Sequence, residues 1–574
     1  MVKRLFCAGV AAWLVLPAFA EVSLSNEFVL LRFSGNGALT SLLEKKTGRE
    51  LVRKAIPFVR VLRMNGTALD PERLEARGSG RFAWLFPDGG EAEFAVEPFE
   101  GGWTFTVKTF TVKDFQTLEC CRVDPVCREW MGSFVNAISD SRSVVCVRSY
   151  DLEANARCHD GIVRATVDAP FEPVGKRAGF AAGPREGFRE RLKAMTIASG
   201  APRSEHGGAW SMDSDAARRS YVFARPKDGD IGYWIDFVKR AGFSHIHIVQ
   251  GWTTGFGHYP INPDFFPGGM DQMKEAAANV HAAGLTIGIH TLTGCISFGD
   301  GWMTPECSDE LISDLTYTLS APLAGDATEM TVEELPDRKH SLVMTYSSRG
   351  NAFRIGKEIV QYSGIRREKP YAFTGLQRGA FGTKKGGTYP AGTKAEYLHQ
   401  LYNAFYPAPG SALAGKLADR IAEIYDYCDM DEVYLDGSEG MGTRYAIDWM
   451  RHAIFSRCGR KTGRIPMVEA SCGNANNWWF QTRTGTCDYP NWGAKSFHDW
   501  HLRQAIENGS KANFLRPQLG WWCPCLDTPD ARGHFPDEME YFAAKNAGVD
   551  SAMSIIGVSG RPLPVGLRRQ MAIL

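Results

Sequence analysis

The sequence has no surplus of charge of either sign. Its 65 Lys and Arg residues balance 65 Asp and Glu residues, so the 574-residue chain has a formal net charge of zero. No run of like charges is long enough to form a nucleic-acid arm or a polybasic membrane patch. We therefore expect no nucleic-acid partner, and a ligand that is neutral or recognised locally.

Long apolar runs are also missing. The best candidate lies in the first twenty residues, MVKRLFCAGVAAWLVLPAFA, and it falls short of the roughly 18 apolar residues that span a bilayer. Lys3 and Arg4 precede it and Ala18-Phe19-Ala20 closes it, which is the layout of a cleavable secretory signal. We predict a signal peptide over residues 1–20, cleavage near Ala20, a secreted or periplasmic protein, and no stable membrane insertion.

Two kinds of ligand motif are absent as well. No helix pattern opens with a Gly-rich phosphate-binding turn, which argues against a doubly wound nucleotide-binding fold. No His-x-x-x-His spacing occurs, and Cys523-Pro524-Cys525 has no second cluster at zinc-ligand spacing. We expect no cofactor and no metal.

Cysteine, in contrast, is plentiful. Of 14 cysteines, only Cys7 lies in the predicted signal peptide. An oxidising compartment would permit disulfides in the rest of the chain. Spacing alone does not give the connectivity. The candidates in the N-terminal half are Cys120, Cys121, Cys127, Cys146 and Cys158.

The length exceeds what one hydrophobic core usually serves, so several domains are expected. Residues 21–205 alternate apolar and polar positions between Gly, Asn and Asp turns, as in VSLSNEFVLLRF and FTVKTFTVKDF. This pattern predicts an antiparallel β-sandwich.

From residue 206 to residue 574, strand patterns alternate with helix patterns. SYVFA, FSHIHIVQGW and LTIGIHTLT are the first three predicted strands, and DEVYLDGSEG contains the fourth. IPMVEASC, the segment around CDYPNWG, ANFLRPQLGWW and DSAMSIIGV supply four more. Eight such units predict a (β/α)₈ barrel.

The barrel pattern is interrupted over residues 313–397. Short strand patterns with Gly turns replace helix periodicity here, as in NAFRIGKEIVQYSGI. We predict a small β-rich insertion after strand three. Because βα loops lie on the substrate-binding face of such barrels, the insertion should overhang the site.

Catalytic groups of barrel enzymes gather where strands end, which makes Asp436 the leading candidate. The apolar run Val433-Tyr434-Leu435 places this carboxylate at the end of strand four. The alternative is a helix cap, although Ser438 or Glu439 could serve that purpose. Glycoside hydrolysis needs a second carboxylate. Asp488 ends predicted strand six and Glu469 ends predicted strand five, and the order of preference is Asp488, then Glu469.

Aromatic residues follow several predicted strands and could stack on the C–H faces of sugars. About half of them are expected to contact ligand, and the rest to pack in the core. The candidates are Trp252, Trp478, Trp479, Trp492, Trp521 and Trp522. His258, Tyr259, His290, Asn476, His498 and Arg516 are candidates for recognising hydroxyl or carboxylate groups.

With these motifs the chain resembles the α-galactosidase clan and neighbouring retaining α-glycosidases. SLSNEFVLLRFSGNGALTSLLEKKTGREL is similar to mutarotase-like sandwich domains, and strand four ends in VYLDG. The clan's nucleophile is an Asp ending strand four and its acid/base an Asp ending strand six, so the resemblance implies these roles for Asp436 and Asp488. The sequence departs from the clan's Lys-x-Asp strand, since it has Tyr434-Leu435-Asp436. The resemblance also implies a C-terminal β domain, so we expect a chain that ends at Leu574 to be a fragment.

We therefore predict a glycoside hydrolase that cleaves oligo- or polysaccharides by a retaining two-carboxylate mechanism. One alternative is a polysaccharide lyase, with Tyr489 or His498 as base and Arg516 neutralising a uronate carboxylate. Another is a non-catalytic glycan-binding protein on a barrel that has lost its activity.

Overall fold

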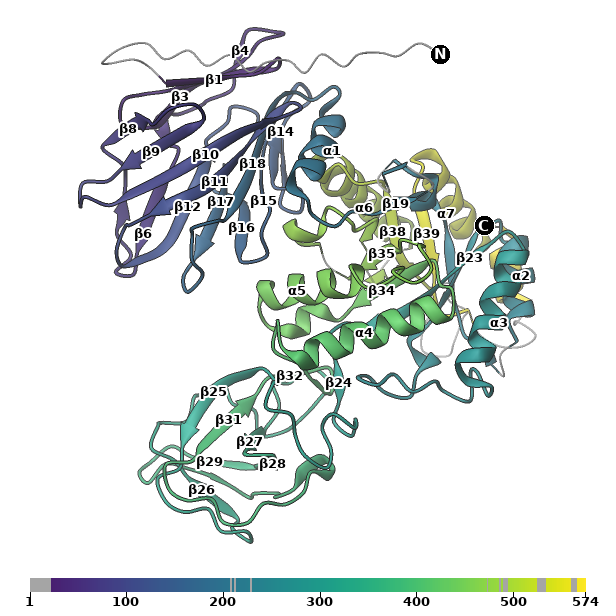
Figure 1. Cartoon of the computed structure of the whole chain (residues 1–574). Helices are drawn as coiled ribbons and strands as arrows, with labels where there is room; N and C mark the ends of the chain where they lie inside the picture. Colours follow the sequence, from purple (N-terminus) through teal and green to yellow (C-terminus); the bar gives the residue numbers. More distant parts are fainter. Residues whose placement is uncertain are drawn as a thin grey trace.

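The structure is a computed structural model that describes residues 22–206, 209–210, 213–227, 230–471, 473–484, 487–488, 494–523, 533–558 and 565–573. The predicted signal peptide, Tyr489 and Trp492 lie outside the described residues, as does the side chain of Asp488. Figure 1 shows an N-terminal β part, a mixed part with helices around a sheet, and a second, smaller β part.

The N-terminal part consists of antiparallel sheets around one hydrophobic core. Two of its long strands, β10 and β11, pair as a hairpin within an eight-stranded sheet. Aromatic residues fill the core; Phe58 contacts Trp84, Phe105 and Phe180. The strands are β1 (Val22–Ser25), β2 (Val29–Phe33), β3 (Ala38–Glu44), β4 (Arg49–Glu50), β5 (Ile56–Pro57), β6 (Arg60–Arg63), β7 (Ala68–Leu69), β8 (Arg73–Ala76), β9 (Arg81–Leu85), β10 (Glu91–Phe99), β11 (Gly102–Phe110), β12 (Phe115–Val123), β13 (Trp130–Gly132), β14 (Ala137–Ser139), β15 (Ser143–Ser149), β16 (Ala154–His159), β17 (Ile162–Asp168) and β18 (Arg177–Pro184).

A helix follows these strands where the sequence predicted only strands and turns. Helix α1 (Phe188–Ser199) buries Phe188, Leu192 and Met195, whose spacing of three to four residues fits one helix face. Gly200 ends the helix in the left-handed conformation. A short hairpin of β19 (Glu205–His206) and β20 (Ala209–Trp210) comes next.

The mixed part is built on one curled parallel sheet. Its strand order is β36-β35-β34-β23-β22-β21-β39-β38-β37, and neighbouring strands in this order are parallel. The two end strands, β36 and β37, are separated in the chain only by residues 485–486, which are not described. The strands are β21 (Tyr221–Ala224), β22 (His245–Ile248), β23 (Thr286–Leu292), β34 (Glu432–Asp436), β35 (Met467–Ala470), β36 (Arg483–Thr484), β37 (Cys487–Asp488), β38 (Gln518–Trp522) and β39 (Ala552–Ile555).

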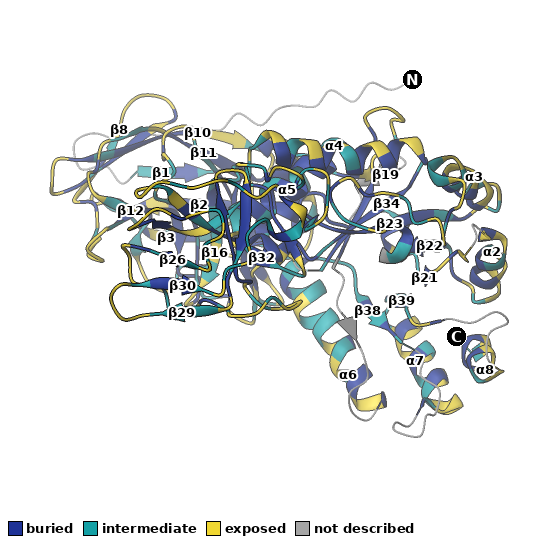
Figure 2. Ribbon diagram, turned by 90° about the horizontal axis from the view of Figure 1, so that it is seen from below, coloured by how far each residue is buried: buried dark blue, intermediate teal, exposed yellow. Residues whose placement is uncertain are grey.

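Helices pack around this sheet. Figure 2 shows α2 and α3 with exposed residues on their outer sides and the buried strands beside them, toward the middle of the view. The amphipathic sequence explains this: α2 buries Ile231, Trp234 and Val238 and turns its charged residues outward. The helices are α2 (Ile231–Arg240), α3 (Gly269–Ala282), α4 (Ala412–Tyr427), α5 (Arg444–Phe455), α6 (Ala494–Gln504), α7 (Pro536–Gly548) and α8 (Val565–Ile573), with 3₁₀ segments η1 (Asp215–Arg218), η3 (Gln250–Trp252), η5 (Ser438–Met441) and η6 (Ala475–Asn477).

One predicted element has a different form. A π-helical segment, η7 (Ala505–Ala512), continues α6, so strand seven begins only at Gln518 and not near Ala512. Pro517 lacks the N–H that would extend the strand backward.

The insertion between β23 and α4 has a hydrophobic core of its own, which includes Tyr317, Phe353, Tyr362, Phe373 and Tyr397. In Figure 1 it lies below α4, with β24 and β32 at the end nearest α4. Its strands are β24 (Ile296–Ser297), β25 (Ser313–Thr318), β26 (Glu329–Thr331), β27 (Ala352–Ile355), β28 (Glu358–Gln361), β29 (Gly364–Arg366), β30 (Ala372–Thr374), β31 (Lys394–Leu398), β32 (Gln400–Leu401) and β33 (Ala404–Phe405), and it contains the 3₁₀ segment η4 (Ala380–Gly382).

The five N-terminal cysteines considered for disulfides are free thiols, and four of them are buried. Within the described ranges, no helix has the length and apolar character needed to cross a membrane.

Candidate functional site

Asp436 is the last residue of β34, and its side chain is 21% exposed. Its Oδ2 lies 3.0 Å from Nε2 of His290, which stands on the neighbouring strand β23. Because a carboxylate can only accept hydrogen bonds, His290 donates from Nε2. The parallel register His290↔Tyr434 and Leu292↔Asp436 brings these two strand-end residues together.

Opposing effects act on the pKa of Asp436. Burial raises it, but the hydrogen bond and positive charge of His290, the Gly437 N–H and Ser471 together lower it below its usual range. Asp436 is therefore an ionised carboxylate at neutral pH, held by fixed donors and partly open to solvent.

The alternative role considered for Asp436 is a helix cap. Helix α5 is capped by Thr443, whose hydroxyl accepts from the Ala446 N–H. The N-cap of η5 is Gly437, with no side-chain hydrogen bond. Among the described residues, the one backbone N–H that donates to the Asp436 carboxylate is that of the next residue, Gly437, so capping a helix does not explain its position.

Glu439 lies in the loop after Asp436 and is exposed. Its carboxylate accepts hydrogen bonds from Tyr402 at 2.8 Å and from Ser471, which follows β35, at 3.0 Å. This carboxylate and Tyr402 were not predicted as site residues.

Tyr402 comes from the insertion. It forms, with Asn403, the two-residue turn between β32 and β33, and both residues have φ of 55°. Such turns favour Asn and Gly, so a tyrosine here carries backbone strain of about 1–3 kcal/mol. Its hydroxyl contact with Glu439 and its ring contact with the exposed Tyr346, at 4.9 Å, give it a position beside the end of β34. An unfavourable turn residue was the sequence signal that could have found it.

Trp252 and Tyr259, in contrast, are fully buried. The Trp252 indole donates to the His290 carbonyl at 2.7 Å, and Tyr259 donates to the Leu292 carbonyl at 2.9 Å. Their rings stack at 5.6 Å. Trp252 therefore positions strand β23 and His290, and it does not present a face to a sugar.

The adjacent residues Trp521 and Trp522 point to opposite sides of β38, as strand geometry requires. Trp521 lies inside the curled sheet, 5.8 Å from the ring of His290 and 5.3 Å from that of Tyr434. Trp522 is buried against His498 and Phe542 on the helix side. Of these two tryptophans, Trp521 is the one whose ring lies near His290.

Trp478 and Trp479 are buried between two parts of the molecule. The guanidinium of Arg148, on β15 of the N-terminal part, lies 3.8 Å from the Trp479 ring and 5.0 Å from the Trp478 ring. The Trp478 indole donates to Asn513. Both indoles thus pack a domain interface, a correction of their predicted role in sugar stacking.

The structure also gives the positions of three polar candidates. His258 is half-exposed and bonded to Asp300 at 2.8 Å, with its ring 4.2 Å from Trp302. Asn476 is buried, with its amide directed to Asp448. Arg516 precedes β38, so it lies at the opposite end of the sheet from Asp436.

The two candidate acid/base residues differ in what is described. Glu469 is fully buried, and the Tyr221 hydroxyl lies 2.7 Å from both of its carboxylate oxygens. Burial, with a contribution from Glu432, raises its pKa to about 8. Its position inside the sheet, bonded to the first residue of β21, argues against the acid/base role at Asp436. Asp488 ends β37, paired with Trp522, and its backbone alone is described.

No protein-family model matches the sequence, and no curated protein matches it. Among solved structures, the GH36 α-galactosidase AgaB from Geobacillus stearothermophilus matches with a TM-score of 0.50 and 9% identity, over 98% of this chain and 85% of that one. The α-galactosidase from Lactobacillus brevis gives a TM-score of 0.47 at 9% identity, over 96% and 82%. That from Thermus thermophilus, in complex with stachyose, gives 0.40 at 14% identity, over 85% and 97%. The chain thus resembles AgaB in fold, as the sequence predicted.

Proposed function

We propose that the protein is a secreted glycoside hydrolase, a retaining α-glycosidase with Asp436 as nucleophile. The observation that carries the proposal is the Asp436 carboxylate, partly exposed at a strand end and kept ionised by His290. The fold shared with AgaB, an α-galactosidase, makes terminal α-galactosides the first substrates to test.

The proposal includes a closed (β/α)₈ barrel. The strand order supports it, because β36 and β37 are consecutive in the chain and stand at the two ends of the sheet. Read as one strand, they complete eight strands and place Asp436 and Asp488 at the same, carboxyl-terminal end.

In the first step, Asp436 attacks the anomeric carbon while the acid/base residue protonates the leaving oxygen. A covalent glycosyl ester forms and the aglycone departs. In the second step the acid/base residue takes a proton from water, which displaces Asp436 from the sugar with overall retention. His290 stabilises the carboxylate before attack and as the ester breaks.

Asp488 is our proposed acid/base residue, because it ends a strand at the same end of the sheet as Asp436, whereas Glu469 is fully buried. Sugar recognition is assigned to Glu439, whose exposed carboxylate can accept hydroxyl hydrogen bonds, and to the Tyr346 and Tyr402 rings, which offer faces for stacking. Trp521 is the one predicted tryptophan that we keep in this group.

The test is turnover of p-nitrophenyl α-galactoside, and of other p-nitrophenyl glycosides, by the full chain. Asp436→Asn keeps the shape but removes the attacking anion, so activity should fall at least about 10³-fold on every substrate. The matched control is Asp419→Asn on α4, whose carboxylate is 67% exposed and bonded to Arg457. Near wild-type turnover by a folded Asp436→Asn would refute the mechanism, and sugar binding without turnover by the wild type would indicate a binding protein.

Asp488→Asn separates the second role. It should retain the first step on substrates with activated leaving groups, and azide should restore the second step by replacing water. Full activity in Asp488→Asn would remove this residue from the mechanism. Proton NMR of the first-formed sugar anomer tests retention directly.

A further inference from the structure

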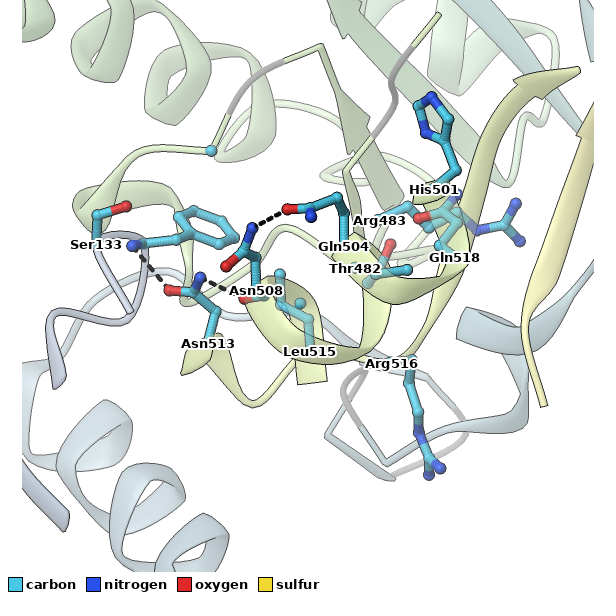
Figure 3. A pocket seen from close by; sticks show the side chains of 14 residues that line it. Ser133, Thr482, Arg483, His501, Gln504, Asn508, Asn513, Leu515, Arg516 and Gln518 are labelled. Atoms are coloured by element: carbon cyan, nitrogen blue, oxygen red, sulfur yellow. Dashed lines mark hydrogen bonds between the residues drawn. The ribbon is translucent and has the colours of Figure 1, made fainter. Parts of the chain in front are cut away.

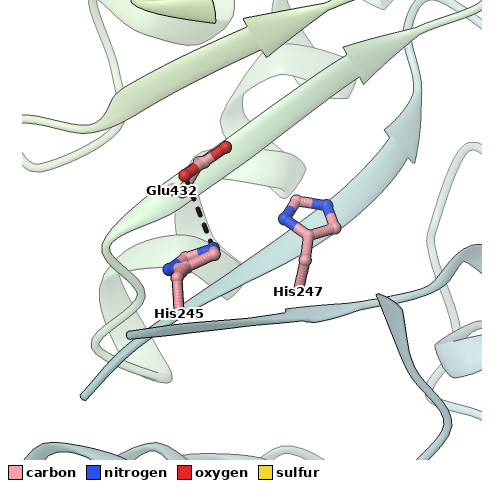
Figure 4. A group of neighbouring side chains, drawn as sticks. All are labelled: His245, His247 and Glu432. Carbon is pink, nitrogen blue, oxygen red and sulfur yellow. Dashed lines mark ion pairs between the residues drawn. The ribbon is translucent and has the colours of Figure 1, made fainter. Parts of the chain in front are cut away.

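A second polar group lies inside the sheet, at the end opposite Asp436. His245 and His247 stand on β22, and Glu432 is the first residue of β34 (Figure 4). All three side chains are fully buried. One ligand atom from each can be chosen so that all three atoms lie within 4.8 Å of one another.

These side chains have hydrogen-bonding atoms that nothing in the described residues satisfies. Both ring nitrogens of His247 and Nε2 of His245 lack a hydrogen-bond partner. The Glu432 carboxylate has one side-chain partner, Glu469. Each unsatisfied buried polar group costs about 1–3 kcal/mol, and more if charged. Three unsatisfied imidazole nitrogens beside a buried carboxylate indicate a ligand that these groups would bind together.

The hydrogen bonds of His245 show what kind of ligand fits. Its Nδ1 lies 2.9 Å from the Thr286 hydroxyl, which lies 3.3 Å from the Ser244 carbonyl. Since the hydroxyl donates to that carbonyl, His245 donates from Nδ1, and its Nε2 carries a lone pair.

This lone pair faces an acceptor. Nε2 of His245 is 3.4 Å from Oε2 of Glu432, so two acceptor atoms approach each other when the carboxylate is ionised. A cation relieves that repulsion. Two ligand atoms at zinc distances of about 2.0–2.1 Å in tetrahedral geometry are about 3.3 Å apart, which matches this separation.

The backbone leaves room beside the three residues. Gly288 on β23 lies between the two strands that carry them, and a Cβ there would be 2.8 Å from the Glu432 Cβ and 3.0 Å from Nδ1 of His247. Any larger residue would occupy the space between the imidazole and the carboxylate.

Other charged groups surround the cluster. Arg483, on β36, comes within 3.9 Å of Glu432, and its guanidinium lies over the Tyr221 ring. Glu469 on β35, Asp431 and Arg219 also act on Glu432. Groups of both signs of charge therefore surround the three side chains.

We propose that His245, His247 and Glu432 bind one divalent transition-metal ion, of which zinc best suits two imidazoles and a carboxylate. The ion is structural: it joins β22 to β34 inside the sheet. Thr286 holds His245 in the tautomer required, as partners of metal-bound histidines commonly do. This proposal does not depend on the proposed glycosidase activity. It departs from the sequence expectation of no metal, because the three ligands come from strands far apart in the chain.

A cavity lies next to Arg483. It has a volume of about 310 Å³ and is lined by Thr482, Arg483, His501, Arg516 and Gln518, among others (Figure 3). Arg483 thus borders this cavity on one side and Glu432 on the other.

The experiment uses tag-free full-length protein, stripped with a chelator, exposed to zinc and separated from free metal. We expect about one zinc per chain by elemental mass spectrometry. X-ray absorption should show nitrogen and oxygen ligands at about 2.0–2.2 Å and no sulfur shell near 2.3 Å. A sulfur shell would assign the metal to the cysteines and overturn the proposal, as would less than 0.1 zinc per chain.

His247→Gln and Glu432→Gln should each reduce bound zinc at least tenfold. The control His159→Gln changes a surface histidine, 76% exposed, and should leave it unchanged. Zinc should raise the Tm of the wild type, by about 3 °C or more, but not that of His247→Gln. Undiminished zinc in both folded variants would overturn the proposal; if neither variant folds, the absorption spectrum of the wild type decides.

Discussion

At the scale of single residues, the central pair is Asp436 and His290. Burial of the carboxylate and donation from the imidazole act in opposite directions on the Asp436 pKa, and the donors dominate. Trp252 supports this pair from behind, since it binds the His290 carbonyl. The sequence predicted His290 and Trp252 as site residues. Only the structure shows that His290 donates to Asp436 and that Trp252 donates to the His290 carbonyl.

The pair predicts a pH effect. The active form of Asp436 is ionised, and its lowered pKa keeps it ionised on the acid side of neutrality. His290→Gln removes the imidazole whose hydrogen bond and electrostatic interaction lower the Asp436 pKa, so that pKa should rise. The acid limb of kcat/KM should therefore move to higher pH. The control His258→Gln removes a histidine bonded to Asp300 instead. An acid limb that stays in place in His290→Gln would contradict the assigned role of His290.

At the scale of elements, the sequence predicted the parallel strands and their helices well, because each combines a short buried run with an amphipathic helix. It did not predict α1 or η7. It also did not predict the side to which each strand-end tryptophan points. Trp521 and Trp522 are neighbours in sequence, yet a strand alternates its side chains, so one lies inside the sheet and the other among helices.

The insertion makes a prediction at this scale. Ser313 and Leu398 pair across β25 and β31, so residues 314–397 can be replaced by a short Gly-Ser linker. The segment removed contains its own core, and the remaining sheet should fold with a Tm within a few degrees of the wild type. Activity on long glycans should fall, because Tyr346 is lost and Tyr402 loses its ring contact. Unchanged activity and specificity would show that the insertion does not shape the site.

At the scale of the whole molecule, Arg148 of the N-terminal part contacts the segment that follows β35 in the mixed part. It is fully buried, donates to the carbonyls of Phe134, Val135 and Ala475, and lies over two tryptophans. No sequence pattern distinguishes this arginine from surface arginines, since the Ala475 carbonyl is 327 residues away and the two tryptophan rings belong to the same distant segment.

Arg148→Ala should therefore destabilise the molecule. It leaves a cavity and unsatisfied carbonyls, which together cost about 3–5 kcal/mol of unfolding free energy. Urea unfolding measures this loss, and Arg142→Ala, at an exposed position in the same part, is the control. Equal stabilities of the two variants would mean that Arg148 does not hold the interface.

The account as a whole depends on Asp436 attacking a sugar, and covalent trapping tests this most directly. A galactose-configured cyclophellitol aziridine, which esterifies a glycosidase nucleophile, would be incubated with the full chain and the product analysed by intact and peptide mass spectrometry. We predict one label per chain, on the peptide that contains Asp436, with parallel loss of activity and no labelling of Asp436→Asn. Labelling of another carboxylate in an enzyme that hydrolyses α-galactosides would contradict the account.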